Sequence, residues 1–185
     1  MLATCLLVLI LSASSQTNAQ EKDLLDLVNK MTVNEKCGQM TQVTFDVIEK
    51  ENYILNEDPV DLIKLKKAIV EKHVGSILNT PGNIAQKAEI WQKIITHIHD
   101  ETQNTRLKIP VIYGIDSIHG ANYIQEAVLF PQPLAQAASF NTEISEKIGE
   151  IVAKETRATG IPWNFSPSMD IGRQPLWPRY KLVFL

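Results

Sequence analysis

The sequence is poor in cysteine and holds no pair that could form a disulfide once its N-terminal segment is removed. Its 185 residues include two cysteines, Cys5 and Cys37. Cys5 lies in an apolar segment typical of a cleaved leader, so Cys37 would then have no intrachain partner. Cys37 lies in an apolar helical pattern, and we expect it to be a buried, inert thiol rather than a nucleophile.

Strong charge of one sign is also missing, and so is a membrane-spanning run after the N-terminus. The chain carries 18 Lys and Arg against 21 Asp and Glu, for a formal net charge of -3. This mild acidity gives no electrostatic footprint for nucleic acid or an anionic membrane. Beyond the N-terminal segment, no stretch reaches the roughly 18 apolar residues that cross a bilayer. We therefore expect no nucleic-acid partner and, after leader cleavage, no membrane partner.

The N-terminal segment has the pattern of a secretory signal peptide. No charged side chain occurs before Glu21, an apolar run is centred on residues 6–11, and "TNA" precedes a cleavage point after Ala19. Positive charge comes only from the α-amino group, because the segment has no Lys or Arg. We expect residues 1–19 to be a signal peptide and residues 20–185 to form the mature protein, which is secreted or lysosomal.

Helical and strand patterns alternate along the rest of the chain. Helical spacing predicts helices over residues 23–31, 32–40, 61–73, 84–102 and 142–159. Apolar runs predict strands at 74–79 and 109–115, and residues 161–171 are predicted to be a third strand with its exit loop. Thr32 and Glu35 fit a capping box, Asn141 is a good N-cap, and Gly160 suits a helix C-terminus. Residues 43–60 are expected to be a loop. Strands that are apolar on both faces and alternate with helices indicate a parallel α/β fold.

Polar clusters follow all three predicted strands. Asn79 follows the first, "DSIHG" (residues 116–120) the second, and "SPSMDIGRQPLWPR" (residues 166–179) the third. Ligands of parallel α/β folds gather at these carboxyl ends. Carboxylate and guanidinium groups suit a hydroxyl-rich ligand, and Trp163 or Trp177 could stack on a sugar. A hydroxy-acid or phosphate ligand is disfavoured, because no Gly-rich cradle follows any strand.

Individual side chains in these clusters have competing interpretations. For Asp116 we favour direct ligand contact over capping of its loop. For His119 we favour a role in holding the turn over ligand contact. Arg173 and Arg179 compete for the ligand, and one of them is expected to form a salt bridge with Asp170, which we interpret as structural.

Two further motifs favour ordinary roles. "HIHD" contains His97, His99 and Asp100, but helical residues two apart do not share a face, so we expect no metal site. Asn164 begins an Asn-Phe-Ser glycosylation sequon, but it lies in a predicted strand, and we expect it to be unmodified.

Five segments together resemble the N-terminal domain of glycoside hydrolase family 3, from about Leu24 to Tyr180. They are "KCGQMTQ", "VGSILN", "IPVIYGIDSIHGANY", "LFPQPLAQAASFN" and "KETRATGIPWNFSPSMDIGRQPLWPR". The chain resembles the β-glucosidase branch, including its secreted or lysosomal type. The N-acetyl-β-glucosaminidase branch has a "DQEGG"-like turn where this chain has "DSIHG".

The resemblance implies a (β/α)8 TIM-type barrel followed by an α/β sandwich domain, with no cofactor and no metal. It implies retaining hydrolysis of terminal non-reducing β-D-glucosyl residues by an aspartate nucleophile and a glutamate acid/base. By similarity, Asp116 binds hydroxyls of the non-reducing glucose, and Arg179 binds the same sugar. His119 and Arg173 match motif positions but take no direct role from the resemblance.

The resemblance also implies that the barrel is incomplete. The family continues after "WPR" with an "ETFGEDP"-like segment, whereas this chain continues with "YKLVFL". A complete barrel takes about 250 residues, so we expect only the first three or so βα units. Both catalytic carboxylates are expected beyond Leu185, so no catalytic residue is assigned within the chain. The alternative is a non-catalytic, truncated sugar-binding or regulatory form.

Overall fold

A computed structural model describes residues 21–168 and 173–178 of the chain. The predicted signal peptide, Asp170 and Arg179 lie outside these residues. The chain divides into two compact units, Met1–Cys37 and Gly38–Leu185.

Residues 21–30 of the first unit are helical, and the predicted capping box opens the next helix, α2 (Val33–Gln39). The Thr32 N–H donates to the Glu35 carboxylate at 2.8 Å, and the Glu35 N–H donates to Thr32 Oγ1 at 3.2 Å. The expectation of a buried Cys37 is wrong, because its thiol is exposed. The helical spacing predicted the helix correctly, but it did not show whether another element packs over the Cys37 side chain.

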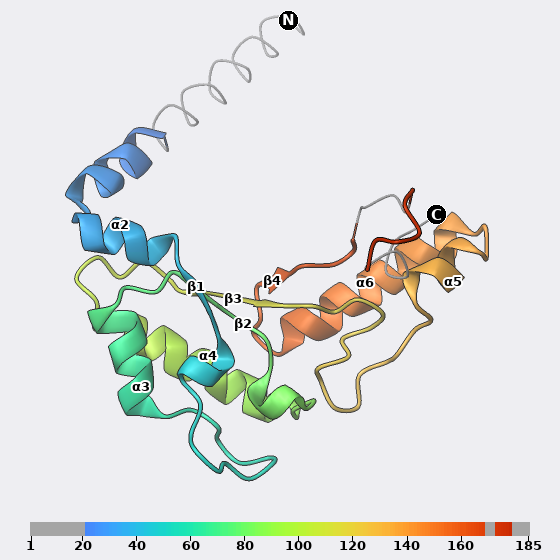
Figure 1. The fold of residues 1–185 in the computed structure, drawn as a ribbon, viewed down its shortest axis with the longest axis horizontal. Coiled ribbons are helices and arrows are strands. Elements are labelled where there is room, and N and C mark those ends of the chain that lie inside the picture. The colour runs from blue at the N-terminus through green and yellow to red at the C-terminus, as the bar shows by residue number, and fades with distance from the viewer. Residues whose placement is uncertain (1–20, 169–172, 179–185) are drawn as a thin grey trace, which may run out of the picture. The chain divides into compact units, whose positions relative to one another are not determined.

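Within its described residues, the second unit is built on four parallel strands in the order β1-β2-β3-β4 (Figure 1). The strands are β1 (Gln42–Thr44), β2 (Ser76–Leu78), β3 (Ile112–Ile115) and β4 (Trp163–Asn164). In register, one row across the sheet contains Thr44, Leu78, Gly114 and Trp163.

Helices connect each strand to the next. Helix α3 (Leu62–Lys66) and the π-helical turn η2 (Lys67–Glu71) join β1 to β2, and α4 (Ala88–Thr102) joins β2 to β3. Helices α5 (Pro133–Ala137) and α6 (Thr142–Ala158) join β3 to β4. Three strand-helix units followed by a fourth parallel strand confirm the predicted partial barrel.

Several predicted boundaries shift for identifiable reasons. Most of strand β1 and all of the 3-10 turn η1 (Phe45–Val47) lie within residues 43–60, which were predicted to be a loop. The sequence did not indicate β1 because three strand residues are too few to show an alternation of apolar and polar side chains. Helix α4 begins at Ala88 rather than at residue 84. The 3-10 turn η3 (Pro81–Asn83) precedes it, and the backbone of Gln86 pairs with Tyr123 and Gln125 instead of continuing a helix.

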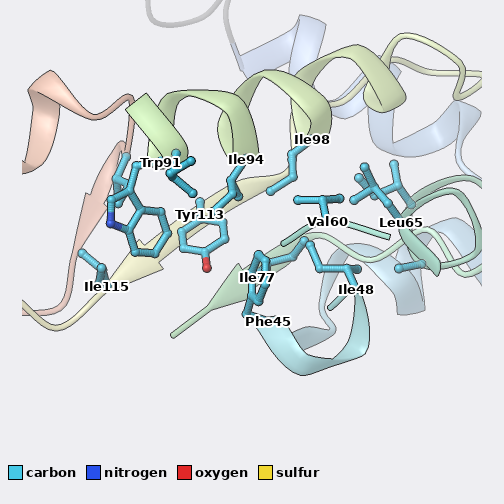
Figure 2. Close-up of a cluster of buried hydrophobic side chains, with 14 of the residues drawn as sticks. Phe45, Ile48, Val60, Leu65, Ile77, Trp91, Ile94, Ile98, Tyr113 and Ile115 are labelled. Atoms are coloured by element: carbon cyan, nitrogen blue, oxygen red, sulfur yellow. The ribbon is translucent and has the colours of Figure 1, made fainter. Parts of the chain in front are cut away.

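One face of the sheet forms the core with the helices (Figure 2). Successive side chains of a strand point to opposite faces, so Ile77 and the paired Tyr113 share this face with Ile115. All three are at least 99% buried, and they pack with Trp91, Ile94 and Ile98 of α4. The rings of Trp91 and Tyr113 meet edge to face at 5.6 Å.

The opposite face is much less covered. Gly114 pairs with Trp163, and Ile112 lies two residues before Gly114 on the same face. The side chain of Ile112 is 47% exposed, and that of Trp163 is 40% exposed. In a closed barrel this face is the interior, which side chains from the whole ring of strands fill.

The N-terminus of α3 supports a pH-dependent prediction. The Asp61 carboxylate accepts hydrogen bonds from the N–H groups of Lys64 and Ile63, at 3.1 and 2.9 Å. The Lys64 N–H is the main cause of a lowered Asp61 pKa. Because the folded-state pKa lies below the unfolded value of about 3.9, this stabilisation is present above that pH and is lost as the pH falls through the folded-state pKa.

We therefore expect Asp61→Ala to lower the melting temperature at neutral pH, with the difference from the wild type shrinking below about pH 4. Thermal melts followed by circular dichroism between neutral and acidic pH measure this difference. Asp61→Asn is the matched control, since its amide oxygen keeps the cap without a titratable charge. A deficit for Asp61→Ala that is constant with pH would contradict the assignment.

Candidate functional site

Asp116 directly follows β3 at the carboxyl end of the sheet. It is half-buried, whereas its neighbours Ile115 and Ser117 are buried. Alternation along the strand places Asp116 with Ile112 and Gly114, on the face opposite the helical core. The predicted candidate therefore lies where ligands of parallel α/β folds bind.

Hydrogen bonds from the end of β4 fix the backbone on both sides of Asp116. The Phe165 N–H donates to the Ile115 carbonyl at 2.9 Å. The Asn164 side-chain oxygen accepts from the N–H groups of Ser117 and Ser166, at 3.0 and 3.1 Å. Asn164, the first residue of the glycosylation sequon, therefore positions the loop that carries Asp116.

A buried hydroxyl pair secures the same loop to α6. Ser117 Oγ lies 3.0 Å from Thr156 Oγ1, and both side chains are at least 97% buried. Because a buried hydroxyl without a partner is costly, this pair restricts the loop to one position against the helix.

An aromatic pair lies beside Asp116 on the uncovered face. The rings of Trp163 and Phe165 meet edge to face, with centroids 4.6 Å apart at 76°. The Phe165 ring lies over Gly114, where an added Cβ would be 2.3 Å from Phe165 Cζ. The structure thus brings Trp163 to the strand next to Asp116. Trp177 is half-buried in the segment 173–178, and sugar stacking by either indole stays a prediction.

Gly114 gives a direct test of this packing. We expect Gly114→Ala to destabilise the protein by about 1–3 kcal/mol, because the Phe165 ring must move away from the new methyl group. Chemical denaturation measures the change in the free energy of unfolding.

Gly149→Ala in α6 is the matched control for that substitution. Nothing lies within 4 Å of the Cβ that would be added there. We expect this variant to be as stable as the wild type or about 0.5–1 kcal/mol more stable. Equal stability changes at the two glycines would contradict the proposed packing of Phe165.

The turn after Asp116 is held by its backbone. The carbonyl of His119 accepts from the Phe130 N–H at 2.7 Å. Gly120 has a φ of 117°, and a Cβ there would lie 2.2 Å from the Val128 carbonyl oxygen. His119 thus contributes to the turn through its carbonyl, while the role of its imidazole stays a prediction.

A second polar cluster lies after β1 and β2. The Glu49 carboxylate accepts from the Gly82 N–H at 2.7 Å, and the Tyr113 hydroxyl donates to the Asn79 carbonyl. Burial, with a smaller contribution from the charge of Glu49, raises the pKa of Tyr113 well above its usual value. Burial also raises the pKa of Tyr53, against an opposing hydrogen bond from Gln86. Both phenols are therefore neutral near neutral pH; the Tyr113 hydroxyl donates to Asn79, and the Tyr53 hydroxyl accepts from Gln86 Nε2. Asn79, the polar residue that follows the first predicted strand, is exposed here.

Gln86 connects three of the loops, a role that the sequence did not reveal. Its side chain is fully buried, and Nε2 donates to the Tyr53 hydroxyl at 3.1 Å and to the Ile84 carbonyl at 2.9 Å. Its backbone pairs with Tyr123 and Gln125 in the loop after β3. No signal in a single sequence distinguishes this glutamine from an ordinary helical residue.

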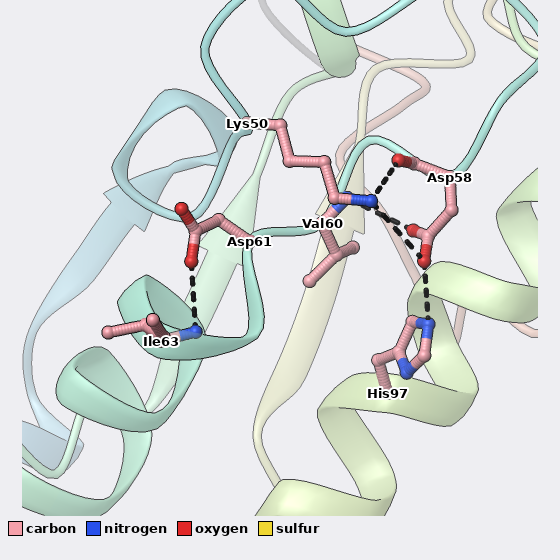
Figure 3. A network of polar contacts seen from close by, with 6 residues as sticks. All are labelled: Lys50, Asp58, Val60, Asp61, Ile63 and His97. Carbon is pink, nitrogen blue, oxygen red and sulfur yellow. Dashed lines mark hydrogen bonds and ion pairs between the residues drawn. The ribbon is translucent and has the colours of Figure 1, made fainter.

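The histidines of α4 have no metal site in the structure. His97 Nε2 lies 3.0 Å from Asp58 Oδ2, and Lys50 Nζ donates to the Asp58 carbonyl at 2.8 Å (Figure 3). Among the described residues, no group of three or more His, Cys, Asp or Glu side chains could hold a metal ion. His97 therefore anchors the loop between β1 and α3 to α4. Likewise, none of the helices in the described part is long and apolar enough to cross a membrane.

The sequence is similar to one protein family and to several known enzymes. The model of the glycosyl hydrolase family 3 N-terminal domain matches residues 32–184. The lysosomal beta glucosidase of Dictyostelium discoideum is 39% identical over 176 residues, which are 90% of this chain and 21% of that protein. The periplasmic beta-glucosidase of Salmonella typhimurium is 28% identical over 162 residues, covering 87% of this chain and 18% of that protein.

Solved structures show the same fold. The exo-1,3/1,4-beta-glucanase from a Pseudoalteromonas species superposes with a TM-score of 0.69 at 29% identity, covering 88% of this chain and 19% of that one. The beta-glucosidase from Listeria innocua, in complex with isofagomine, gives a TM-score of 0.61 at 30% identity, with coverage of 86% and 20%. The chain thus spans about a fifth of the length of these relatives.

Proposed function

Since the chain belongs to glycosyl hydrolase family 3 through its N-terminal domain, we propose that it supplies the glucose-binding part of a retaining β-glucosidase. The whole protein hydrolyses terminal non-reducing β-D-glucosyl residues, and its nucleophile and acid/base lie in a segment beyond Leu185. The observation that carries the proposal is the place of Asp116, half-buried at the carboxyl end of β3 with its flanking backbone held by β4.

The chemistry of Asp116 suits this role. An ionised carboxylate accepts hydrogen bonds from adjacent sugar hydroxyls, each contributing about 1.5–3 kcal/mol as a charge-assisted bond. Trp163 on the neighbouring strand offers an aromatic face near the same site. Arg179 is the proposed second sugar ligand, through its donor fork.

The proposal also covers the domain organisation of the chain and its cellular location. Residues 1–19 are a signal peptide, and residues 20–185 are an incomplete barrel domain. The product is secreted or lysosomal, which agrees with the lysosomal and periplasmic relatives.

A chimera tests the glucosidase proposal. Residues 20–185 replace the matching segment of the Dictyostelium relative, and hydrolysis of an aryl β-glucoside is measured beside an aryl β-xyloside. We expect the chimera to prefer the glucoside. A chimera that melts like the relative but hydrolyses neither substrate, or prefers the xyloside, would count against the proposed substrate.

The 185-residue chain alone is predicted to be inactive. Retaining hydrolysis needs two carboxyl groups about 5–5.5 Å apart across the scissile bond, and the proposal places both of them beyond Leu185. We expect no turnover of an aryl β-glucoside above the buffer rate, and robust turnover would refute the placement of the nucleophile.

Calorimetry with glucose distinguishes the alternative, a non-catalytic sugar-binding or regulatory form. The incomplete-site proposal predicts no stable binding to the folded chain, whereas the alternative predicts saturable binding without turnover.

A further inference from the structure

Asn164 lies on the face of the sheet opposite to Asp116. In β4 it pairs with Ile115, and its neighbour Trp163 lies in the row of Gly114 on the less covered face. Because successive side chains of a strand alternate between faces, Asn164 shares the helical face with Ile115, whereas Asp116 lies on the other. A sugar held by the Asp116 carboxylate therefore lies across the sheet from Asn164.

A groove along α6 supports this placement. Asn164 lines it together with Ser117, Thr156 and Ser166. Asp116 is not among the described residues that line the groove. The amide of Asn164 thus faces α6 rather than the site proposed for the sugar, so any effect of Asn164 on sugar binding passes through the backbone that it holds.

One side-chain oxygen of Asn164 joins two segments of backbone. An amide oxygen has two lone pairs, and Asn164 Oδ1 accepts from the N–H groups of Ser117 and Ser166 at 3.0 and 3.1 Å. Ser117 directly follows Asp116, and Ser166 lies in the exit from β4. The bond from Ser166 fixes the orientation of the amide, so the bond from Ser117 holds the residue after Asp116 in one position.

We propose that Asn164, supported by Thr156, is a positioning residue of the sugar site, which sets the place of the Asp116 carboxylate without contacting the sugar. The inference rests on the proposed function of Asp116. The Ser117 hydroxyl lies 3.0 Å from that of Thr156, which attaches the same loop to α6. The two attachments hold the carboxylate in place before the sugar arrives, and this lowers the cost of ordering the site on binding.

Kinetics of the chimera with the Dictyostelium relative tests the role of Asn164. Asn164→Leu is of similar size and lacks the acceptor. We expect kcat/KM for the aryl β-glucoside to fall by about 10–100-fold, because small misplacements of a binding group have effects of this order. Asn164→Asp is expected to retain activity within about threefold, because its carboxylate accepts the same N–H bonds.

Ser166→Ala is the matched control for these two variants. It removes the glycosylation sequon, as both Asn164 substitutions do, but it keeps the backbone N–H that donates to Asn164. We expect it to have normal kinetics, which would separate loss of the acceptor from loss of the sequon.

A double-mutant cycle separates positioning from a general loss of stability. If Asn164 acts through Asp116, Asn164→Leu lowers kcat/KM by less than about threefold once Asp116→Ala is present. Val152→Ala truncates a buried side chain of α6 that takes no part in these hydrogen bonds. It is expected to lower the melting temperature and leave kcat/KM unchanged. Independent losses that multiply in the cycle, or normal kinetics for a folded Asn164→Leu chimera, would overturn the proposal.

A second variant releases the same loop from α6. Thr156→Val removes the hydroxyl that meets Ser117 and is expected to lower kcat/KM by about 2–10-fold. If Asn164→Leu does not fold, unchanged kinetics of Thr156→Val overturns the proposal in its place. Normal kinetics for Asp116→Ala would refute the proposed function of Asp116, whereas a crippled Asp116→Ala beside a normal Asn164→Leu would refute the positioning role alone.

Discussion

Asp116→Ala in the chimera with the Dictyostelium relative is expected to lower kcat/KM for an aryl β-glucoside by about 10²–10⁴-fold. The carboxylate is proposed to accept from two adjacent hydroxyls, and each bond contributes about 1.5–3 kcal/mol. A loss of about 3–6 kcal/mol corresponds to that range, because each 1.36 kcal/mol changes a rate tenfold. Steady-state kinetics at the pH optimum of the chimera measures the change.

Asp100→Ala is the matched control for that experiment. Asp100 is an exposed aspartate near the C-terminal end of α4, which leads into the start of β3 rather than into the carboxyl end where Asp116 lies. We expect normal kinetics for it. Thermal melts of both variants separate a folding defect from a lost sugar contact. Near-normal kinetics for a folded Asp116→Ala chimera would refute the proposed role of the carboxylate.

Features set by local chemistry could be predicted from the sequence. The capping box of Thr32 and Glu35 forms as expected, and the Asn141 side chain accepts from the Ile144 N–H as an N-cap. Gly160 follows α6 with a φ of 89°. Each feature depends on residues within four positions of one another, so the sequence contains the whole cause. The place of Asp116 was predictable for a related reason, since an apolar strand ends directly before it.

Features set by contacts distant in sequence could not be predicted in the same way. The burial of Gln86 depends on Tyr53 and on the loop around Tyr123. The role of Asn164 depends on Ser117, 47 positions earlier in the chain. Strand β1 is recognisable only by its pairing with β2. In each case the role of the residue depends on a contact with a residue distant in sequence, and folding of the sheet is what brings the two together.

Trp91→Ala is expected to have the largest effect on stability, at about 3–5 kcal/mol. Trp91 is fully buried and packs edge to face on Tyr113. Its Nε1–H donates to the Tyr123 carbonyl at 2.9 Å. The substitution therefore leaves a cavity in the core and removes one of the two hydrogen bonds that the Tyr123 carbonyl accepts, the other coming from the Gln86 N–H at 3.1 Å. Chemical denaturation measures the loss, and hydrogen exchange across residues 121–125 reports on the loop.

Trp91→Phe separates the two contributions. A phenyl ring keeps much of the core packing but cannot donate to Tyr123, so we expect a smaller loss of stability with a similar rise in exchange at the loop. Leu176→Ala is the surface control, because Leu176 is 87% exposed and its truncation is expected to change stability by less than about 0.5 kcal/mol. Unchanged loop exchange in both Trp91 variants would show that the indole stabilises the core without positioning the turn that follows Asp116.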